Sequence, residues 1–238
     1  MVDLVAVGDV LLDVVAARPE AGELVHGPVV VRAGGSAVNA ARAAVAAGGR
    51  ALVVGCVGDD AAGYAIQREL ERDGIEAALA VDEAMPTGVA LLLDDAVVAT
   101  HGANAALRVD ELPPARATLV SGYLAPAAVE QALAAAHGLR VLDFQTRRDH
   151  RGENADVLIG PAADPDGRRD RVLCRTLGPD GAVAVRGDER AEAVPAVVRD
   201  GPLPGAGDAF AAIFALALAE GAALGDALRR ACDAGSRV

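Results

Sequence analysis

The segment Gly205-Ala206-Gly207-Asp208 combines residues that could hold an anion and move a proton. It precedes an apolar run, 209–219, whose length and composition predict a buried helix. Glycine lets the chain turn tightly, and the first turn of a helix offers N–H groups at the positive end of its dipole. A phosphate would bind there, and the Asp208 carboxylate could take a proton from a hydroxyl that attacks it. A helix cap formed by Asp208 explains the same residues without chemistry.

A second glycine-rich segment, Gly34-Gly35, precedes an Ala-rich run, 37–47, that predicts another helix. Asn39 falls in the first turn of that helix. The two glycines would let a polar ligand approach the backbone, and Asn39 could form a hydrogen bond to it. A tight turn followed by a polar residue at a helix start accounts for the pattern equally well.

Several polar residues and glycines follow short apolar runs that predict buried strands. Strand–helix alternation predicts a parallel, doubly wound α/β sheet, in which strand ends and helix starts meet at one crevice. The residues expected there are Asp9, Asp13, Gly122, Asp143, Gly178 and the segment 205–208.

The rest of the chain predicts a single domain, 1–238, with a small β lid formed by about 14–33 and 86–101. Both lid segments are short β-like runs flanked by Gly and Pro, and we expect the hairpin at 89–100 to pair with 24–32. Two further strands, 182–185 and 193–198, are expected to close the main sheet as a meander.

Composition excludes several classes of protein. The 238 residues are 53% hydrophobic and only 2% aromatic, so Ala, Val and Leu must fill the core. The formal charge of −12 argues against a nucleic-acid partner. The sequence contains no lysine, which excludes the phosphate-loop and protein-kinase mechanisms that depend on one.

Cysteine usage and hydropathy indicate the compartment. The chain has three cysteines, Cys56, Cys174 and Cys232, which is an odd number, and they are widely spaced. This pattern is expected of reduced thiols in a core. The N-terminus has no basic start, and no run of 18 apolar residues occurs. We therefore expect a cytoplasmic protein with no membrane span.

Two separated motifs, 34–41 (GGSAVNAA) and 205–210 (GAGDAF), resemble the signatures of the ribokinase-like (PfkB) carbohydrate kinases. The intervening segments 57–63, 86–88 and 102–104 are similar to the family's segments, in the same order along nearly the whole chain. The resemblance implies a Rossmann-like α/β domain with a β lid. It also implies transfer of the ATP γ-phosphoryl group to a sugar hydroxyl, with Mg²⁺ bridging the phosphates and a homodimer formed through the lid as a possible assembly.

The resemblance also implies roles for individual residues. Asp208 would be the base, and the N–H groups of Gly205, Ala206 and Gly207 would hold the transferring group. The residues on the sugar side would be Asp13, Gly34, Gly35, Asn39, Asn104, Asp143 and Arg147, and those on the nucleotide side Thr176, Gly178 and Gly181. Asp143 and Arg147 belong to a segment similar to Asp-x-Asn-x-Arg of members that act on keto-deoxy sugar acids, although Arg147 also suits a solvated surface charge.

The chain departs from the family pattern at three places. Pro202-Leu203-Pro204 stands where relatives carry Asp-Thr-Thr, which helps to hold a monovalent cation, so we expect no dependence on K⁺. The Asn-x-x-Glu segment linked to Mg²⁺ is missing near 160–165. Relatives continue beyond the position of Val238 into a segment near the adenine, so we expect weak ATP binding.

Two functions remain open at this point: an ATP-dependent kinase of a small sugar or sugar acid, and a sugar- or nucleotide-binding protein that kept the fold but lost catalysis. A nicotinamide-dependent oxidoreductase is disfavoured, because the first strand lacks a Gly-x-Gly-x-x-Gly turn.

Overall fold

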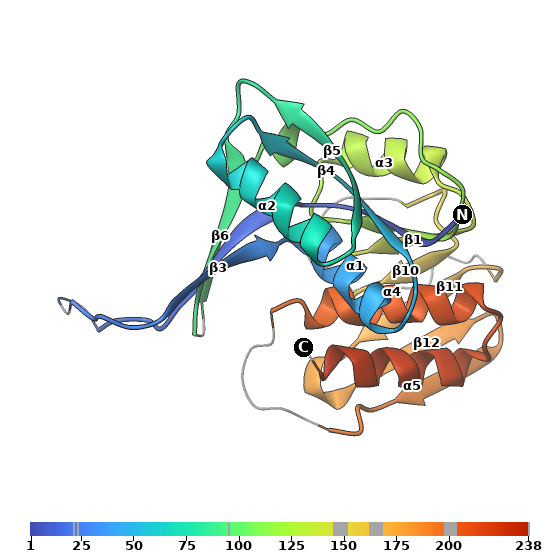
Figure 1. Ribbon diagram of the computed structural model, residues 1–238. Coiled ribbons are helices and arrows are strands. Elements are labelled where there is room, and N and C mark those ends of the chain that lie inside the picture. The colour runs from blue at the N-terminus through green and yellow to red at the C-terminus, as the bar shows by residue number, and fades with distance from the viewer. Residues whose placement is uncertain are drawn as a thin grey trace.

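The computed structural model describes residues 1–20, 22, 24–94, 96–144, 152–161, 169–197 and 204–237. In this part of the chain nine strands form the main sheet, in the order β13-β12-β11-β10-β9-β8-β1-β4-β5 (Figure 1). They are β1 (Val2–Val7), β4 (Ala51–Gly58), β5 (Glu76–Asp82), β8 (Ala115–Ser121), β9 (Leu139–Asp143), β10 (Val157–Ile159), β11 (Val172–Thr176), β12 (Ala182–Arg186) and β13 (Glu189–Ala193). All neighbouring strands are parallel except β11–β12 and β12–β13, so the carboxyl ends of eight strands, all but β12, lie at one edge.

Helices cover both faces of this sheet, as the doubly wound fold predicts. Along β1, Leu4 and Ala6 face one apolar cluster, while Val5 and Val7 face another, as expected when side chains alternate across a buried strand. The first cluster packs against α1 (Ser36–Ala46), α2 (Ala61–Arg72), α4 (Ala206–Ala219) and α5 (Leu224–Gly235), and the second against α3 (Pro126–Ala135). Two single 3₁₀ turns, Ala103–Ala106 and Gly178–Asp180, complete the helical elements. None of the described helices has the length and apolar composition that crossing a bilayer requires.

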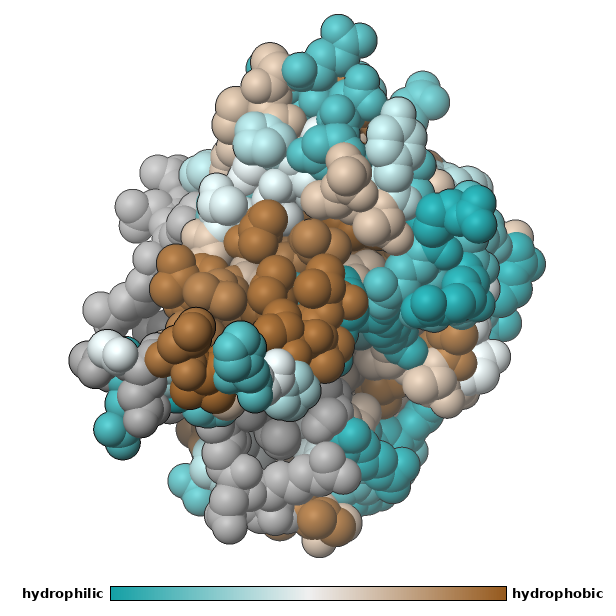
Figure 2. Space-filling model, turned by 60° about the vertical axis from the view of Figure 1, so that its left-hand side comes forward, coloured by the Kyte–Doolittle hydropathy of each residue, from teal (hydrophilic) through white to brown (hydrophobic). Residues whose placement is uncertain are grey.

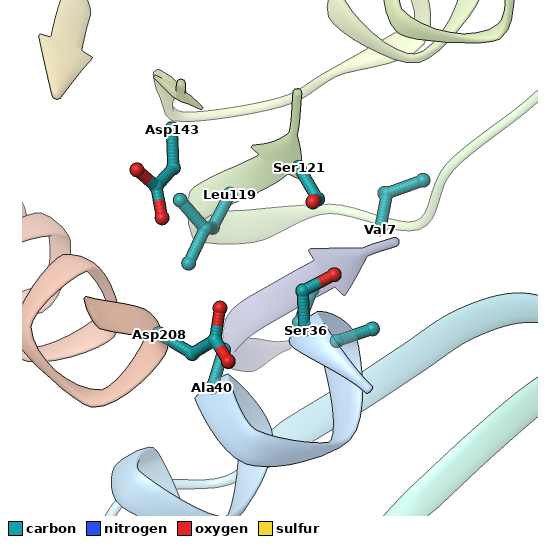
Figure 3. A pocket seen from close by; sticks show the side chains of 9 residues that line it. Val7, Ser36, Ala40, Leu119, Ser121, Asp143 and Asp208 are labelled. Carbon is teal, nitrogen blue, oxygen red and sulfur yellow. The ribbon is translucent and has the colours of Figure 1, made fainter. Parts of the chain in front are cut away.

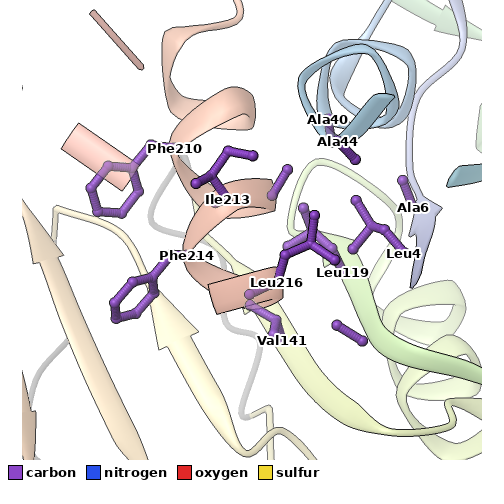
Figure 4. Packing of buried hydrophobic residues seen from close by; sticks show 14 of the residues in the cluster. Leu4, Ala6, Ala40, Ala44, Leu119, Val141, Phe210, Ile213, Phe214 and Leu216 are labelled. Atoms are coloured by element: carbon purple, nitrogen blue, oxygen red, sulfur yellow. The ribbon is translucent and has the colours of Figure 1, made fainter. Parts of the chain in front are cut away.

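Helix α4 is held at the centre of the molecule. Its residues from Ala209 to Ala217 are all buried, as expected for a helix that is apolar on every side. Figure 4 shows Leu216 near the sheet side chains Leu119 and Val141, and Ile213 on the side of α4 toward Ala40 and Ala44 of α1. The burial fixes the position of the α4 N-terminus, which lies at the carboxyl edge of the sheet.

A separate four-stranded sheet, in the order β3-β2-β6-β7, forms the lid. Its strands are β2 (Leu11–Ala16), β3 (Val29–Gly34), β6 (Thr87–Leu93) and β7 (Ala96–Gly102). The prediction that the two segments build one small sheet is confirmed. The pairing differs in detail, because β6 pairs with β2 rather than with the residues at 24–32, and β2 begins earlier than expected.

The outer part of the lid is apolar across its whole width. Pairing aligns Val31, Val14, Leu91 and Val98 in one row, and alternation puts all four on the same face. The two ends of the row are well exposed, Val31 by 56% and Val98 by 67%. Figure 2 shows an apolar patch on this side of the molecule. Large exposed apolar patches are uncommon on monomeric proteins.

Two edge strands of the main sheet differ from the prediction. The final strand is Glu189–Ala193, not 193–198, because a short turn after Arg186 brings the chain back at once. Strand β5 was not predicted. Both strands lie at sheet edges, where the solvated face tolerates Glu, Arg and Ala and the apolar signal is lost.

The burial of α4 predicts a large loss of stability when a central side chain is truncated. Phe214 is fully buried and stacks on Phe210, with ring centroids 5.8 Å apart. We expect Phe214→Ala to lower the free energy of unfolding by about 3–5 kcal/mol, measured by urea denaturation. The control Val81→Ala, at a residue 52% exposed, should change it by less than about 0.5 kcal/mol. Equal effects of the two substitutions would contradict this packing.

Candidate active site

The N-terminus of α4 forms one wall of the candidate site. Gly205 precedes the helix with φ 89°, a left-handed conformation that favours glycine. A Cβ atom there would lie 3.1 Å from Cγ of Asn39, so a larger residue would also press on that side chain. Ala206, Gly207 and Asp208 form the first turn, whose N–H groups have no acceptor inside the helix. This is the geometry that the sequence predicted for an anion hole.

Asp208 is bound directly to the second predicted motif. Its Oδ2 accepts a hydrogen bond of 2.9 Å from Nδ2 of Asn39, which lies in the first turn of α1. The bond joins the starts of two helices that are 169 residues apart in sequence. An amide does not titrate, so Asn39 can hold the carboxylate in one orientation while Asp208 gains or loses a proton.

The environment of Asp208 weakens its acidity. Burial is the main cause of a raised pKa at Asp208. The hydrogen bond from Asn39 lowers this pKa, and the negative charges of Asp13 and Asp9 raise it further. Together they raise the pKa of Asp208 to about 7. A carboxylate with a pKa near neutrality is a suitable general base, because it is ionised in part and still holds a proton once it has taken one.

Asp13 faces the same crevice from the lid. It lies on β2, and its carboxyl group is buried. This burial raises the pKa of Asp13, and the positive charge of Arg32 lowers it. The two glycines before α1 permit this arrangement. A Cβ on Gly34 would overlap the Asp13 carboxylate, and Gly35 has φ 88° and lies against the carbonyl oxygen of Asp9. The diglycine therefore serves close packing beside the site, a role that the sequence did not distinguish from ligand approach.

A small cavity lies between α4 and the ends of β8 and β9. Figure 3 shows Asp208 and Asp143 on opposite sides of it, with the hydroxyl groups of Ser36 and Ser121 at its wall. Its volume of about 10 Å³ suits roughly one water molecule, and four polar side chains are enough partners for one. Asp143 thus lies across this cavity from Asp208, at the sheet edge where its position at a strand end predicted it.

Two residues that the sequence did not single out lie among these acids. Burial, followed by the charges of Asp208, Asp143 and Asp9, raises the pKa of Tyr123 to about 12, so its hydroxyl stays protonated and can donate a hydrogen bond. The sequence held a feature that could have identified it, because Tyr123 follows Gly122 at the end of a predicted strand.

His101 is the other. Its Nδ1 lies 2.9 Å from Oδ2 of Asp9, which joins the end of a lid strand to the loop after β1. Nothing in the sequence pairs these two residues, which are 92 positions apart.

Asn104 has a different environment from the other predicted ligands. Its Oδ1 accepts from the N–H groups of Val10 and Cys56, and its Nδ2 donates to the carbonyl oxygens of Val10 and His101. These four bonds use the whole capacity of the amide, so a sugar hydroxyl would have to displace one of them. They join the lid to β4 and to the loop after β1, and we assign Asn104 a structural role at this junction.

The residues predicted on the nucleotide side form a turn at the carboxyl end of β11. Thr176 ends the strand, and Gly178 and Gly181 take φ 62° and 90° in the turn that follows. The turn is closed by a 2.8 Å hydrogen bond from the Leu177 N–H to the Gly181 carbonyl oxygen. Because β11 is parallel to β9 and β10, this turn lies at the same sheet edge as Asp143. Arg147 lies outside the described residues.

The model for the pfkB family carbohydrate kinases matches residues 1–152 and 160–238. This chain belongs to that family. The PfkB chain is 31% identical over 242 residues to "Bifunctional protein HldE" of Caulobacter sp. (strain K31), across 83% of its own length and 49% of the relative's. It therefore spans about half of that curated relative.

Solved structures share the PfkB fold. A putative ribokinase from Agrobacterium tumefaciens superposes with a TM-score of 0.84 at 22% identity, covering 99% of this chain and 90% of the other. Arabidopsis thaliana ribokinase, complexed with ribose and ATP, superposes with a TM-score of 0.78 at 21% identity, covering 99% and 91%. The family is one of phosphotransferases, and the fold with its lid agrees with the prediction.

The raised pKa of Asp208 predicts a pH-dependent cost in stability. The folded state holds the Asp208 proton more tightly than the unfolded state, so this group makes the protein less stable as the pH rises from about 4 to about 7. Asp208→Asn removes the effect and can keep the bond from Asn39. We expect the melting temperature of the variant, relative to that of the wild type, to increase across this range and to level off above it. A difference that stays constant with pH would show that Asp208 is not a buried, weak acid.

Proposed function

We propose that this protein transfers the γ-phosphoryl group of ATP to a hydroxyl of a small sugar or sugar acid. The observation that carries the proposal is the Asp208–Asn39 hydrogen bond at the start of α4, which puts an oriented base beside an anion hole. A hydroxyl group that accepts a phosphoryl group must lose its proton, so it needs a base next to the phosphate site.

In this reaction the sugar hydroxyl lies against Asp208 and gives its proton to the carboxylate. A bond forms between the sugar oxygen and the γ-phosphorus while the bond to the β–γ bridging oxygen breaks, and ADP leaves with that electron pair. The first N–H groups of α4, from Ala206 to Asp208, would stabilise the negative charge of the group in transfer. The contribution of the chain is therefore position, one proton acceptor and a preorganised positive field.

On the sugar side, Asp13 and Asn39 would bind hydroxyl groups, with Asp143 and the predicted Arg147 nearby. Tyr123 would add a hydroxyl donor between the acids. The support for this assignment is that Asp13, Asp9 and Asp208 lie close enough for their charges to act on one another.

On the nucleotide side, Thr176, Gly178 and Gly181 would line the ATP site. Among the described residues no group of His, Cys, Asp and Glu has an arrangement that could hold a metal ion. We propose that Mg²⁺ arrives with the ATP phosphates, which supply most of its ligands in many such sites. We propose that K⁺ has no effect on turnover, because Pro202 replaces the cation-binding aspartate.

A binding protein without catalysis is the second candidate. The absence of the Asn-x-x-Glu pattern near 160–165 favours it. In that case Asp208 serves only as a polar group in the first turn of α4.

Asp208→Asn separates the two. If Asp208 is the base, the variant should lose about 10²- to 10⁴-fold in kcat with little change in KM, because the proton moves only on the way to the transition state. Asp226 occupies the first turn of α5 and offers a matched control. Asp226→Asn should leave kcat unchanged in an ADP-release assay with a panel of sugars. A wild-type enzyme that turns over no sugar in the panel would leave the binding protein as the function.

We further propose that two copies associate through the apolar row of the lid, Val31, Val14, Leu91 and Val98. The row carries no charge, so it is self-complementary in a chain of charge −12 that repels its own copies elsewhere. Sedimentation velocity should find a dimer, and Val98→Glu should convert it to a monomer. The same change at exposed Val81, on the edge of the main sheet, should leave the dimer intact. A wild-type monomer at all concentrations would reject this assembly.

A further inference from the structure

The crevice-facing side of the lid carries a second polar residue beside Asp13. Strand pairing puts Arg32 directly opposite Asp13, and Ala90 and Ala99 follow in the same row. Side chains in one row of a sheet share a face. The Asp13 carboxylate lies against Gly34, directly before the start of α1, and Asn39 in the first turn of that helix binds Asp208. The charge of Asp13 also raises the pKa of Asp208, so this face of the lid is turned toward the candidate site.

Apolar residues and glycines surround this pair. On the same face, one neighbouring row holds Leu11 with Gly34 and Gly88, and the other holds Val15 with Val30 and Leu92. The remaining positions in the row of Arg32 are the two alanines. Among these positions only Asp13 and Arg32 carry a charge, so they are the side chains that could recognise a polar ligand under the lid.

In the part of the chain that the structure describes, the Arg32 guanidinium forms one long ion pair, with Asp13, and no hydrogen bond. Its closest approach to Asp13 is 3.9 Å, between Nε and Oδ2, which is too long for a hydrogen bond. The Arg32 side chain is 44% exposed, whereas that of Asp13 is 6% exposed.

Arg42 shows what a structural arginine looks like in the same region. It donates to the carbonyl oxygen of Ala33 at 2.6 Å and to the carboxylates of Glu69 and Asp73 at 2.6 and 3.0 Å. Those bonds tie α1 to α2 and to the lid. Arg32 has no comparable set among the described residues, so its fork of donors is available to a ligand.

The charges around the crevice make this position selective. Four carboxyl groups, those of Asp9, Asp13, Asp143 and Asp208, gather there, and they would repel an anionic group from most of the site. Arg32 lies on the lid, away from the base, and its planar fork matches a carboxylate or a phosphate. Among the described residues, Arg32 therefore gives this end of a bound sugar the group best suited to an anionic substituent.

We propose that Arg32 determines acceptor specificity by binding an anionic group, carboxylate or phosphate, of a sugar whose distant hydroxyl is phosphorylated at Asp208. Hydroxyl groups between the two ends would be bound by Asp13. This inference rests on the proposed function for the reaction, but the recognition of the anion can be measured without turnover.

The test measures binding and turnover separately, with matched sugars of one length: a neutral aldose, the corresponding sugar acid and the corresponding sugar phosphate. Wild-type protein should bind at least one anionic member more tightly than the neutral sugar by calorimetry without ATP. Arg32→Gln should lower the affinity for that anionic ligand by about 10- to 100-fold, which is the contribution of one or two charge-assisted hydrogen bonds. The affinity for the neutral sugar should stay nearly unchanged. Arg32→Lys should recover part of the loss. Arg229→Gln, at a 64% exposed arginine of α5, is the control and should bind as the wild type does.

The comparison of the sugar acid with the sugar phosphate decides whether a carboxylate or a phosphate is the natural group. Arg32→Gln could lose affinity for the anionic sugar alone while the wild-type protein releases no ADP with any sugar. This result would support the recognition of an anion and reject the kinase reaction. Equal loss for neutral and anionic sugars, a preference of the wild type for the neutral sugar, or binding of no sugar in the panel would overturn the role of Arg32.

Discussion

The hydrogen bond between Asn39 and Asp208 is the contact on which the site depends, because it fixes the starts of two helices against each other. Each helix begins with a glycine at positive φ, Gly35 before α1 and Gly205 before α4. The buried body of α4 holds one end of the bond, and the packing of α1 on the sheet holds the other. The proposed base, the proposed anion hole and the Asn39 amide are consequently held together as one unit.

Gathering acids around this unit opposes stability and serves chemistry at the same time. Burial and the neighbouring carboxylates make Asp208 a weak acid, and burial followed by the charges of the nearby acids raises the pKa of Tyr123. A core of Ala, Val and Leu with few aromatic residues must offset that cost. Arg32 and His101 of the lid and Arg42 of α1 are cationic or potentially cationic side chains close to these acids in the described part of the chain.

The sequence predicted the parts of the molecule that local patterns determine. Buried strands, the apolar helix α4 and the two glycine-rich helix starts carry strong signals, and the family motifs fixed their order. Strand β5 and the position of β13 were missed because edge strands mix Ala with Glu and Arg. His101 was not singled out, and Asn104 was predicted on the sugar side rather than at the junction of the lid with β4, because their contacts are with partners 92 and 94 positions away. Arg32 gave no signal until strand pairing put it opposite Asp13.

The most direct test of phosphoryl transfer follows the γ-phosphate itself. ATP labelled at the γ-phosphorus is incubated with the protein and a sugar that it binds, and the products are separated. The account predicts that the label appears in a sugar phosphate in equal amount to the ADP formed, with little in inorganic phosphate. Label found in inorganic phosphate alone, or ATP left intact with a bound sugar, would contradict it.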